Sequence, residues 1–212
     1  MCEFNSKEKE IFLSSIRFVS YFFVLIALSV WMWKLAEHYG RDTFGENGIV
    51  ENSQNIVLLA SSCVFGWLAW MNKTCRSVLL CLGSLCLLGL CREQDAWFDE
   101  VLPIVSWRIG YLFPCLAALN GLRQPAVFKR QVLHFLQTPA FYLMFAAMMM
   151  VIPFAQCIGH KSFIAAVVAS EDGELIRALR RMIEESGELM GYALILLAGI
   201  ELFLNIKSVS KK

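Results

Sequence analysis

Twenty residues of this chain read GELMGYALILLAGIELFLNI and run from Gly187 to Ile206. Glu188 and Glu201 are the charged residues in this otherwise apolar stretch. A bilayer core about 30 Å thick is crossed by roughly 20 helical residues. The stretch therefore has the length and composition of a transmembrane helix, with one acid near its first turn.

Five further apolar runs precede this stretch, in a chain of 212 residues that is 58% hydrophobic and 17% charged, with a mean hydropathy of +0.57. These values exceed those of a soluble domain of this size. The connections are too short to bury a core of their own. We predict one all-α integral membrane domain, residues 1–212, with a short amphipathic helix at 173–186. The six transmembrane helices are expected at about 18–36, 54–71, 76–92, 101–120, 133–157 and 187–206.

The connections between the apolar runs alternate in charge, and this alternation predicts the orientation. Basic residues are retained on the cytoplasmic side of a membrane. They gather before the first run, in the second and fourth connections and after the last run: Lys7, Lys9, Arg17, Lys73, Arg76, Arg123, Lys129, Arg130, Lys207, Lys211 and Lys212. The other connections are acidic, so both termini are expected in the cytoplasm and the segment Lys161–Glu185 outside.

Several classes of function leave no trace in the sequence. The chain contains no phosphate-binding loop, dinucleotide fingerprint, nucleophile elbow or zinc-protease motif. Its short basic segments are explained by the cytoplasmic leaflet, so we expect no nucleic-acid partner. The eight cysteines include no C-x-x-C pair. Cys91 and Cys157 both fall near the outer helix ends, and the sequence leaves open whether they form a disulfide.

Proline residues interrupt two of the predicted helices. Pro114 lies in the fourth, and Pro139 and Pro153 lie in the fifth. Each proline removes a backbone donor, so a kink or a local opening is expected at each.

Polar residues from three distant segments are predicted to meet at the outer rim of the bundle. The second apolar run is preceded by ENGIVENSQ at 46–54, the third ends in REQD at 92–95, and the sixth follows EESGE at 184–188. Convergence of charged groups from separate parts of a chain is typical of a binding site. The candidate binding residues are Glu51, Gln54, Arg92, Glu93, Asp95, Asp99, Arg108, Glu184 and Glu188.

Arg108 is expected to be the internal counter-charge of these acids. It follows Pro103 by about five residues, which in a helix corresponds to roughly 8 to 12 Å of depth from the outer surface. A guanidinium inside a bundle keeps its proton and needs a carboxylate or a water-filled cavity. We therefore predict that Arg108 is buried against Glu93, Asp95, Asp99 or Glu188.

The last motif is expected to present two different faces. Glu188, between Gly187 and Gly191, is predicted to face the bundle interior, because small residues allow close helix approach. Glu185 is rotated by about 100° from Glu184. It has Arg181 one turn away, so we expect an exposed pair there and only a minor role for Glu185.

The inventory of ligating residues allows a metal site of one kind. Three histidines are present, and His134 belongs to the opposite side, so a three-histidine zinc site is excluded. A carboxylate site for a divalent metal stays open. Its candidate ligands are Glu51, Glu93, Asp95, Glu184, Glu188 and His160.

The same motifs carry a resemblance. E-x-G-x-x-E at 46–51, R-E-x-D at 92–95 and E-E-x-x-E-L at 184–189 occur in the order found in a group of uncharacterised bacterial inner-membrane proteins of similar size, which this chain resembles over residues 46–205. The resemblance implies a shared polar site and a multi-pass protein of the bacterial inner membrane. It implies no reaction.

Three functions fit these residues. The leading hypothesis is binding or passage of a cation or a polar lipid head group at the periplasmic rim. The second is a membrane enzyme that acts on lipid head groups through a metal or paired carboxylates. The third is an accessory subunit in which the polar residues hold helices together. Sequence alone identifies neither a ligand nor a protein partner nor an oligomeric state.

Overall fold

A computed structural model describes residues 6–45, 48–168 and 172–209. Every regular element in these ranges is a helix, which confirms the all-helical fold class. The contacts divide the chain into two units, Met1–Thr43 and Phe44–Lys212. The prediction of a single domain stays a prediction, and each unit is described by itself.

The first unit is one long helix and the turn that ends it. Helix α1 spans Ser6–Tyr39 and contains the first predicted transmembrane segment. It ends where Gly40 adopts a left-handed backbone conformation with φ of +62°, as glycine often does after a helix. The 3-10 helix η1, Gly40–Phe44, follows, and the hydroxyl of Thr43 donates a hydrogen bond to the carbonyl of Leu35 at 3.1 Å.

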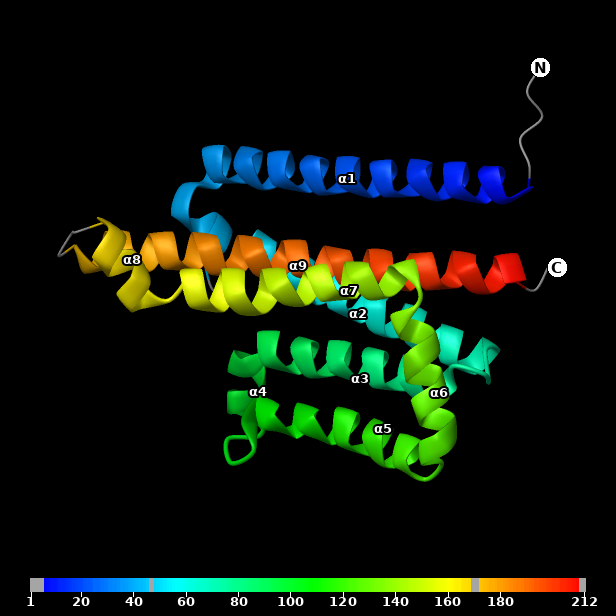
Figure 1. The fold of residues 1–212 in the computed structure, drawn as a ribbon. Coiled ribbons are helices and arrows are strands. Elements are labelled where there is room, and N and C mark those ends of the chain that lie inside the picture. Colours follow the sequence, from blue (N-terminus) through cyan, green and yellow to red (C-terminus); the bar gives the residue numbers. More distant parts are fainter. Residues whose placement is uncertain (1–5, 46–47, 169–171, 210–212) are drawn as a thin grey trace, which may run out of the picture. The chain divides into compact units, whose positions relative to one another are not determined.

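The second unit is a bundle in which five long segments run side by side (Figure 1). Helix α9 packs against α2 and against α7, α2 packs against α3, and α3 packs against α5. These segments are α2 Ile49–Met71, α3 Arg76–Glu93, α5 Leu112–Leu122, α7 Pro139–Met149 with its π-helical continuation η3 Met150–Ile158, and α9 Gly173–Val209. Side chains such as Leu58, Phe65 and Leu189, each at most 1% exposed, form the core between α2 and its neighbours.

Short elements close the two ends of this bundle. They are α4 Asp95–Val101, the 3-10 helix η2 Ser106–Tyr111, α6 Pro125–Leu136 and α8 Lys161–Val168. Helix α6 crosses one end and contacts α3, α5 and α7. Gln131 anchors it: its buried side-chain oxygen accepts hydrogen bonds from the backbone N–H groups of Ser77 and Val78, at 3.0 and 3.4 Å. These N–H groups belong to the first turn of α3, which has no intrahelical acceptor for them.

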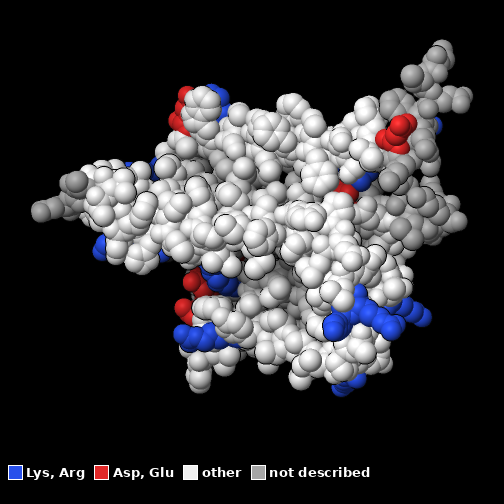
Figure 2. Space-filling model, in the orientation of Figure 1, with Lys and Arg blue, Asp and Glu red and all other residues white. Residues whose placement is uncertain are grey.

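Basic and acidic connections lie at opposite ends of the second unit. Arg123 caps the end of α5, and Lys129 and Arg130 lie in α6. Figure 2 shows Lys and Arg side chains gathered over that corner. The acidic end contains the start of α2, the end of α3, and α4. The charge segregation seen in the sequence is thus also a spatial segregation, whereas the side that faces the cytoplasm stays a prediction.

Four of the described helices are long and apolar enough to cross a membrane, or five if α3 and α4, bent by 74°, count as one span. The candidates are Ile11–Phe44, Ile49–Met71, Pro139–Ile158 and Gly173–Ile206. Several membrane-spanning helices are therefore supported, but the number six is not confirmed.

The fourth predicted helix, 101–120, is wrong in its first half. Helix α4 stops at Val101, and the chain turns through Pro103 to Ser106, whose φ is +55°. A left-handed non-glycine residue interrupts a right-handed helix. The regular α-helix then begins only at Leu112, so Pro114 lies in its first turn and produces no mid-helix kink.

The fifth and sixth predicted helices have different boundaries in the structure. A break at Thr138, whose ψ is 149°, separates α6 from α7, because a residue before proline avoids the helical region. Pro139 therefore starts α7 and does not kink it. The predicted amphipathic helix 173–186 and the predicted span 187–206 form one continuous helix, α9. The polar residues before the boundary are good helix formers, and Gly187 at the boundary packs on Ala155.

Pro153 coincides with a local opening of its helix, as expected for a proline inside a helix. It lies within η3, where the hydrogen bonding widens from the α to the π pattern. Segments of π-helix are often found at functional sites. Gln156, three residues later, contacts acids of α9 from this segment.

Candidate functional site: a polar pocket at the acidic end of the bundle

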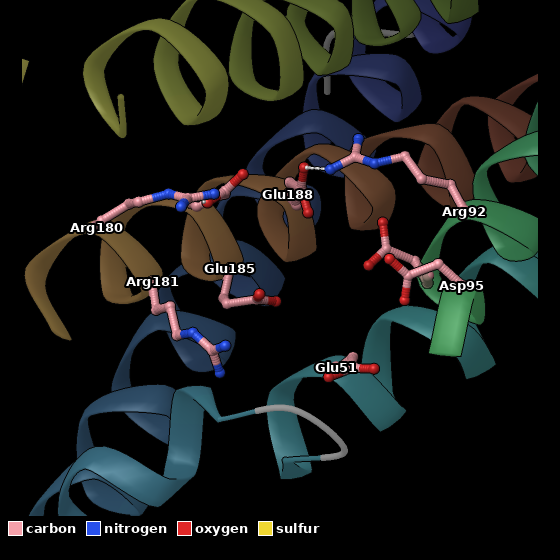
Figure 3. Close-up of a pocket in the computed structure, with 9 residues that line it drawn as sticks. Glu51, Arg92, Asp95, Arg180, Arg181, Glu185 and Glu188 are labelled. Atoms are coloured by element: carbon pink, nitrogen blue, oxygen red, sulfur yellow. Dashed lines mark hydrogen bonds and ion pairs between the residues drawn. The ribbon is translucent and has the colours of Figure 1, made fainter. Parts of the chain in front are cut away.

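A pocket of about 250 Å³ opens between the start of α2, the junction of α3 and α4, and the first half of α9. Its lining combines six acidic with three basic residues: Glu51, Arg92, Glu93, Asp95, Arg180, Arg181, Glu184, Glu185 and Glu188. In Figure 3, Glu51, Asp95, Arg181 and Glu185 point from three helices toward the same opening. The structure thus brings together the three segments that the sequence singled out.

Helix α9 supplies one wall of the pocket through two adjacent rows of charged side chains. Arg180, Glu184 and Glu188 follow one another at four-residue intervals, so they stack on one face. Arg181 and Glu185 form the neighbouring row. Arg180 Nε lies 3.1 Å from Glu184 Oε2, an ion pair between consecutive turns.

Glu188 is the most deeply placed acid of the pocket, with its residue 1% exposed. Arg92 Nη2 lies 2.5 Å from Glu188 Oε1, and Gln156 Nε2 donates to the same oxygen at 2.5 Å. A buried carboxylate is costly unless it is paired and hydrogen-bonded. The end of α3, the last part of η3 and the middle of α9 are therefore connected through one carboxyl group, and the predicted inward orientation of Glu188 is confirmed.

Glu93 is held from the side of α9 as well. The hydroxyl of Tyr192, a residue 4% exposed, donates a hydrogen bond to Glu93 Oε1 at 2.7 Å. Tyr192 lies one turn beyond Glu188, so two consecutive turns of α9 hold the two consecutive residues Arg92 and Glu93. The end of α3 is thereby fixed against α9 by polar contacts at two points.

The prediction that Glu185 is exposed and has only a minor role is wrong. Gln54 Nε2 donates to Glu185 Oε2 and to its backbone carbonyl, both at 2.9 Å, and Glu185 is only partly exposed. The reason is that α2 packs against α9 and covers this face as well. Gln54 itself is fully buried and does not line the pocket, but its hydrogen bonds hold the side chain of Glu185 in place.

The prediction that Arg108 is a buried counter-charge is also wrong. Arg108 is exposed on η2 and does not line the pocket. The depth argument assumed a helix that continues from residue 101, and the turn at Ser106 removes that register. Arg92 takes the place that was assigned to Arg108.

Asp99 is exposed and lies outside the pocket lining, and it has a structural contact instead. Its carboxylate accepts a short hydrogen bond from the hydroxyl of Ser106. Because Ser106 has a positive φ, this bond holds the turn between α4 and η2 in a strained backbone conformation.

The proposed metal ligands do not form a metal site in the described part of the chain. Among these residues, no three His, Cys, Asp or Glu side chains are grouped closely enough to hold an ion. His160 lines a neighbouring pocket and not the one that contains Glu51, Glu93, Asp95 and Glu188. The donor arrangement therefore does not fit a metal centre.

The two cysteines near the outer helix ends do not form a disulfide. Cys91 and Cys157 are both free thiols; Cys91 is partly exposed and Cys157 is exposed. Glu46 and Asn47, with which the first motif begins, lie outside the described residues, as does Glu171.

Sequence reasoning missed Glu185 and four further residues of this site. Arg180 and Arg181 line the pocket, and Gln156 and Tyr192 hold its acids. Gln156 had a usable signal, since it is an amide in an apolar run three residues after a proline. Tyr192 had a weaker one, since it follows Glu188 at four residues.

Comparisons of the chain with protein-family models, with curated proteins and with solved structures found no match. The resemblance to a group of bacterial inner-membrane proteins therefore stays a prediction.

Proposed function

We propose that this chain is a multi-pass membrane protein whose polar pocket binds the ammonium group of a small organic cation, such as the head group of an aminophospholipid. The observation that carries the proposal is the charge of the pocket lining, in which acids outnumber bases six to three. A cation is attracted to such a lining, and an ammonium group donates three hydrogen bonds to the surrounding oxygens.

The size of the pocket supports a ligand of several atoms. A water molecule occupies about 30 Å³ of liquid volume, whereas the pocket measures about 250 Å³. The pocket therefore has room for a primary amine with its short carbon chain. Bare-ion coordination receives no support, since the described residues contain no group of ligands for a metal.

The partners of the individual acids support binding over a purely structural role. Arg92 pairs with Glu188, and Arg180 pairs with Glu184. Glu185 and Glu93 are held by neutral donors, Gln54 and Tyr192, which position a carboxylate without neutralising it. The lining is thus organised, and by count its acidic residues exceed its basic residues by three.

The packing below the pocket supports binding over passage. Leu189 and Ala198 of α9 are 0% exposed. A Cβ added to Gly191 would lie 2.4 Å from Val151 Cγ2, and one added to Gly199 would lie 3.0 Å from Val64 Cγ1. Helix α9 is therefore in close contact with α7, η3 and α2 where a continuous polar path would have to run.

The membrane setting belongs to the same proposal. Several helices are long enough to span a bilayer, and the basic and acidic connections lie at opposite ends of the second unit. We propose six spans in the bacterial inner membrane with both termini in the cytoplasm, which puts the pocket at the outer surface. Helix α9, 37 residues long, measures about 55 Å. Its first turns, with Arg180 and Glu184, then project beyond the hydrocarbon core.

Calorimetric titration of the full chain in detergent with ethanolamine tests this function. Wild-type protein should bind ethanolamine, and Glu185→Gln should weaken binding about tenfold, the value of one charge-assisted hydrogen bond. Glu174→Gln is the matched control, because Glu174 is an exposed acid of the same helix outside the pocket. No heat of binding with wild-type protein, or an equal loss in both variants, would exclude the proposed site.

A further inference from the structure

A second, smaller pocket adjoins the first. It has a volume of about 170 Å³ and lies where η3 ends, α8 begins and α9 passes. Its lining residues are Gln156, Gly159, His160, Lys161, Arg180 and Glu184. Whereas acids dominate the first pocket, three of these residues carry basic side chains and one is acidic.

The two pockets share a wall. Arg180 and Glu184 line both, and they are paired with each other at 3.1 Å. Gln156 lines the second pocket, and its Nε2 donates to Glu188 of the first pocket at 2.5 Å and to Glu184 at 3.4 Å. One layer of side chains therefore separates a negatively charged cavity from a positively charged one.

The donors of the second pocket suit an oxyanion. Lys161 is exposed, and among the described residues it forms no ion pair. His160 Nδ1 accepts a hydrogen bond from the backbone N–H of Ser162 at 3.3 Å, so Nε2 carries the proton of the neutral ring and can donate it. Arg180 uses Nε for Glu184, and a guanidinium has further N–H groups for a second acceptor.

The acid of the second pocket does not cancel this charge. Glu184 is paired with Arg180 and accepts a bond from Gln156, so its oxygens are directed at the shared wall. Lys161 and His160 belong to another segment, the turn into α8. An anion in this pocket would therefore meet donors from Lys161 and His160, and a third donor from Arg180 at the shared wall.

We propose that the two pockets together bind one zwitterion, a phosphate joined to a primary amine through a two-carbon link, as in phosphoethanolamine. The ammonium group occupies the acidic pocket and the phosphate occupies the basic pocket. This inference rests on the proposed function for its amine half and adds the phosphate half. Two opposite charges separated by a short link require two oppositely charged cavities that are directly adjacent, which is the arrangement at the Arg180–Glu184 wall.

The test compares ligands that differ only in the phosphate, by calorimetric titration of the full chain in detergent. Ethanolamine carries the amine alone, and phosphoethanolamine carries both groups. Wild-type protein should bind phosphoethanolamine about tenfold more tightly than ethanolamine, since a phosphate gains charge-assisted hydrogen bonds. Lys161→Gln should remove this preference and leave the affinity for ethanolamine unchanged. Lys129→Gln, an exposed lysine of α6, is the control and should keep the preference.

The outcomes separate the two proposals. If ethanolamine binds but the phosphate adds no affinity, or if Lys161→Gln weakens both ligands equally, the phosphate half is wrong and the amine site stands. If ethanolamine does not bind at all, both proposals fail. A third arm with phosphatidylethanolamine in mixed micelles distinguishes the source of the head group: stronger binding than phosphoethanolamine identifies a lipid, and weaker binding identifies a free solute of the same chemistry.

Discussion

Arg92 and Glu188, 96 residues apart in the chain, form an ion pair of 2.5 Å in which the glutamate side chain is 2% exposed and the arginine side chain 38% exposed. This pair joins the end of α3 to the middle of α9. The same carboxyl oxygen also accepts the amide of Gln156. The pocket is therefore built around one buried acid that three segments hold in common.

Removing Arg92 should be strongly destabilising. Arg92→Met leaves the carboxyl group of Glu188 buried without its counter-ion, and breaking a buried pair in this way costs about 3 kcal/mol of unfolding free energy. The double variant Arg92→Met/Glu188→Leu should recover most of this loss, because a hydrophobic pair needs no counter-charge. Thermal unfolding in detergent measures both. Arg108→Ala is the control and should change stability by less than about 0.5 kcal/mol, since Arg108 is exposed. A double variant no more stable than the single one would contradict the pairing.

Tyr192→Phe removes one hydroxyl group and nothing else. The lost bond to Glu93 is a hydrogen bond to an acidic group in a buried place, which contributes about 1.5 to 3 kcal/mol. The melting temperature of the purified protein should fall accordingly. Tyr142→Phe, at an exposed tyrosine of α7, provides the comparison and should leave it unchanged. Equal melting temperatures of Tyr192→Phe and wild type would show that Tyr192 does not hold the end of α3.

Two glycines should respond in opposite ways to alanine. A Cβ at Gly191 would lie 2.4 Å from Val151 Cγ2 and 3.1 Å from the backbone oxygen of Ala147, so Gly191→Ala should cost about 1 to 3 kcal/mol through overpacking. Gly66 in α2 has nothing within 4 Å of such a Cβ. Gly66→Ala should therefore be neutral or stabilising by up to about 1 kcal/mol. Chemical unfolding of both variants measures the difference, and a stable Gly191→Ala variant would contradict the close packing below the pocket.

The orientation can be tested with native cysteines. Cys157 lies at the acidic end of the second unit and Cys75 lies at the basic end, and both are free thiols. In intact cells, a membrane-impermeant maleimide should label a variant that retains only Cys157. A variant that retains only Cys75 should be labelled only after permeabilisation. The reverse pattern would invert the topology and move the pocket to the cytoplasmic side.

Much of the fold could be predicted from apolar length alone, because a span of about 20 residues is a property of local sequence. The segment around Arg108 could not, since the break depends on the backbone of one residue, Ser106, which no pattern of hydrophobicity encodes. The sequence also predicted two helices, 173–186 and 187–206, where the structure has the single helix α9. A change from charged to apolar residues at Gly187 marks a membrane boundary, and a helix crosses such a boundary without ending.

The candidate site could be located from the sequence but not oriented in detail. Charge alternation and segment order were sufficient to bring Glu51, Arg92 and Glu188 to the same end of the bundle. The role of Glu185 depends on which face of α9 the second helix covers, and that is decided by the packing of Gln54 against it. Such contacts between distant segments are not encoded in the spacing of residues within one helix.

An experimental density map of the protein in nanodiscs that contain phosphatidylethanolamine as their amine-bearing lipid would show directly whether the pocket binds an amine. We expect continuous density between Glu51 and Glu185 that extends past the Arg180–Glu184 pair toward Lys161, and we expect this density to be absent in nanodiscs made of phosphatidylglycerol alone. A pocket that contains only ordered water in both preparations, or density that is the same in both, would contradict the claim that the pocket recognises an amine.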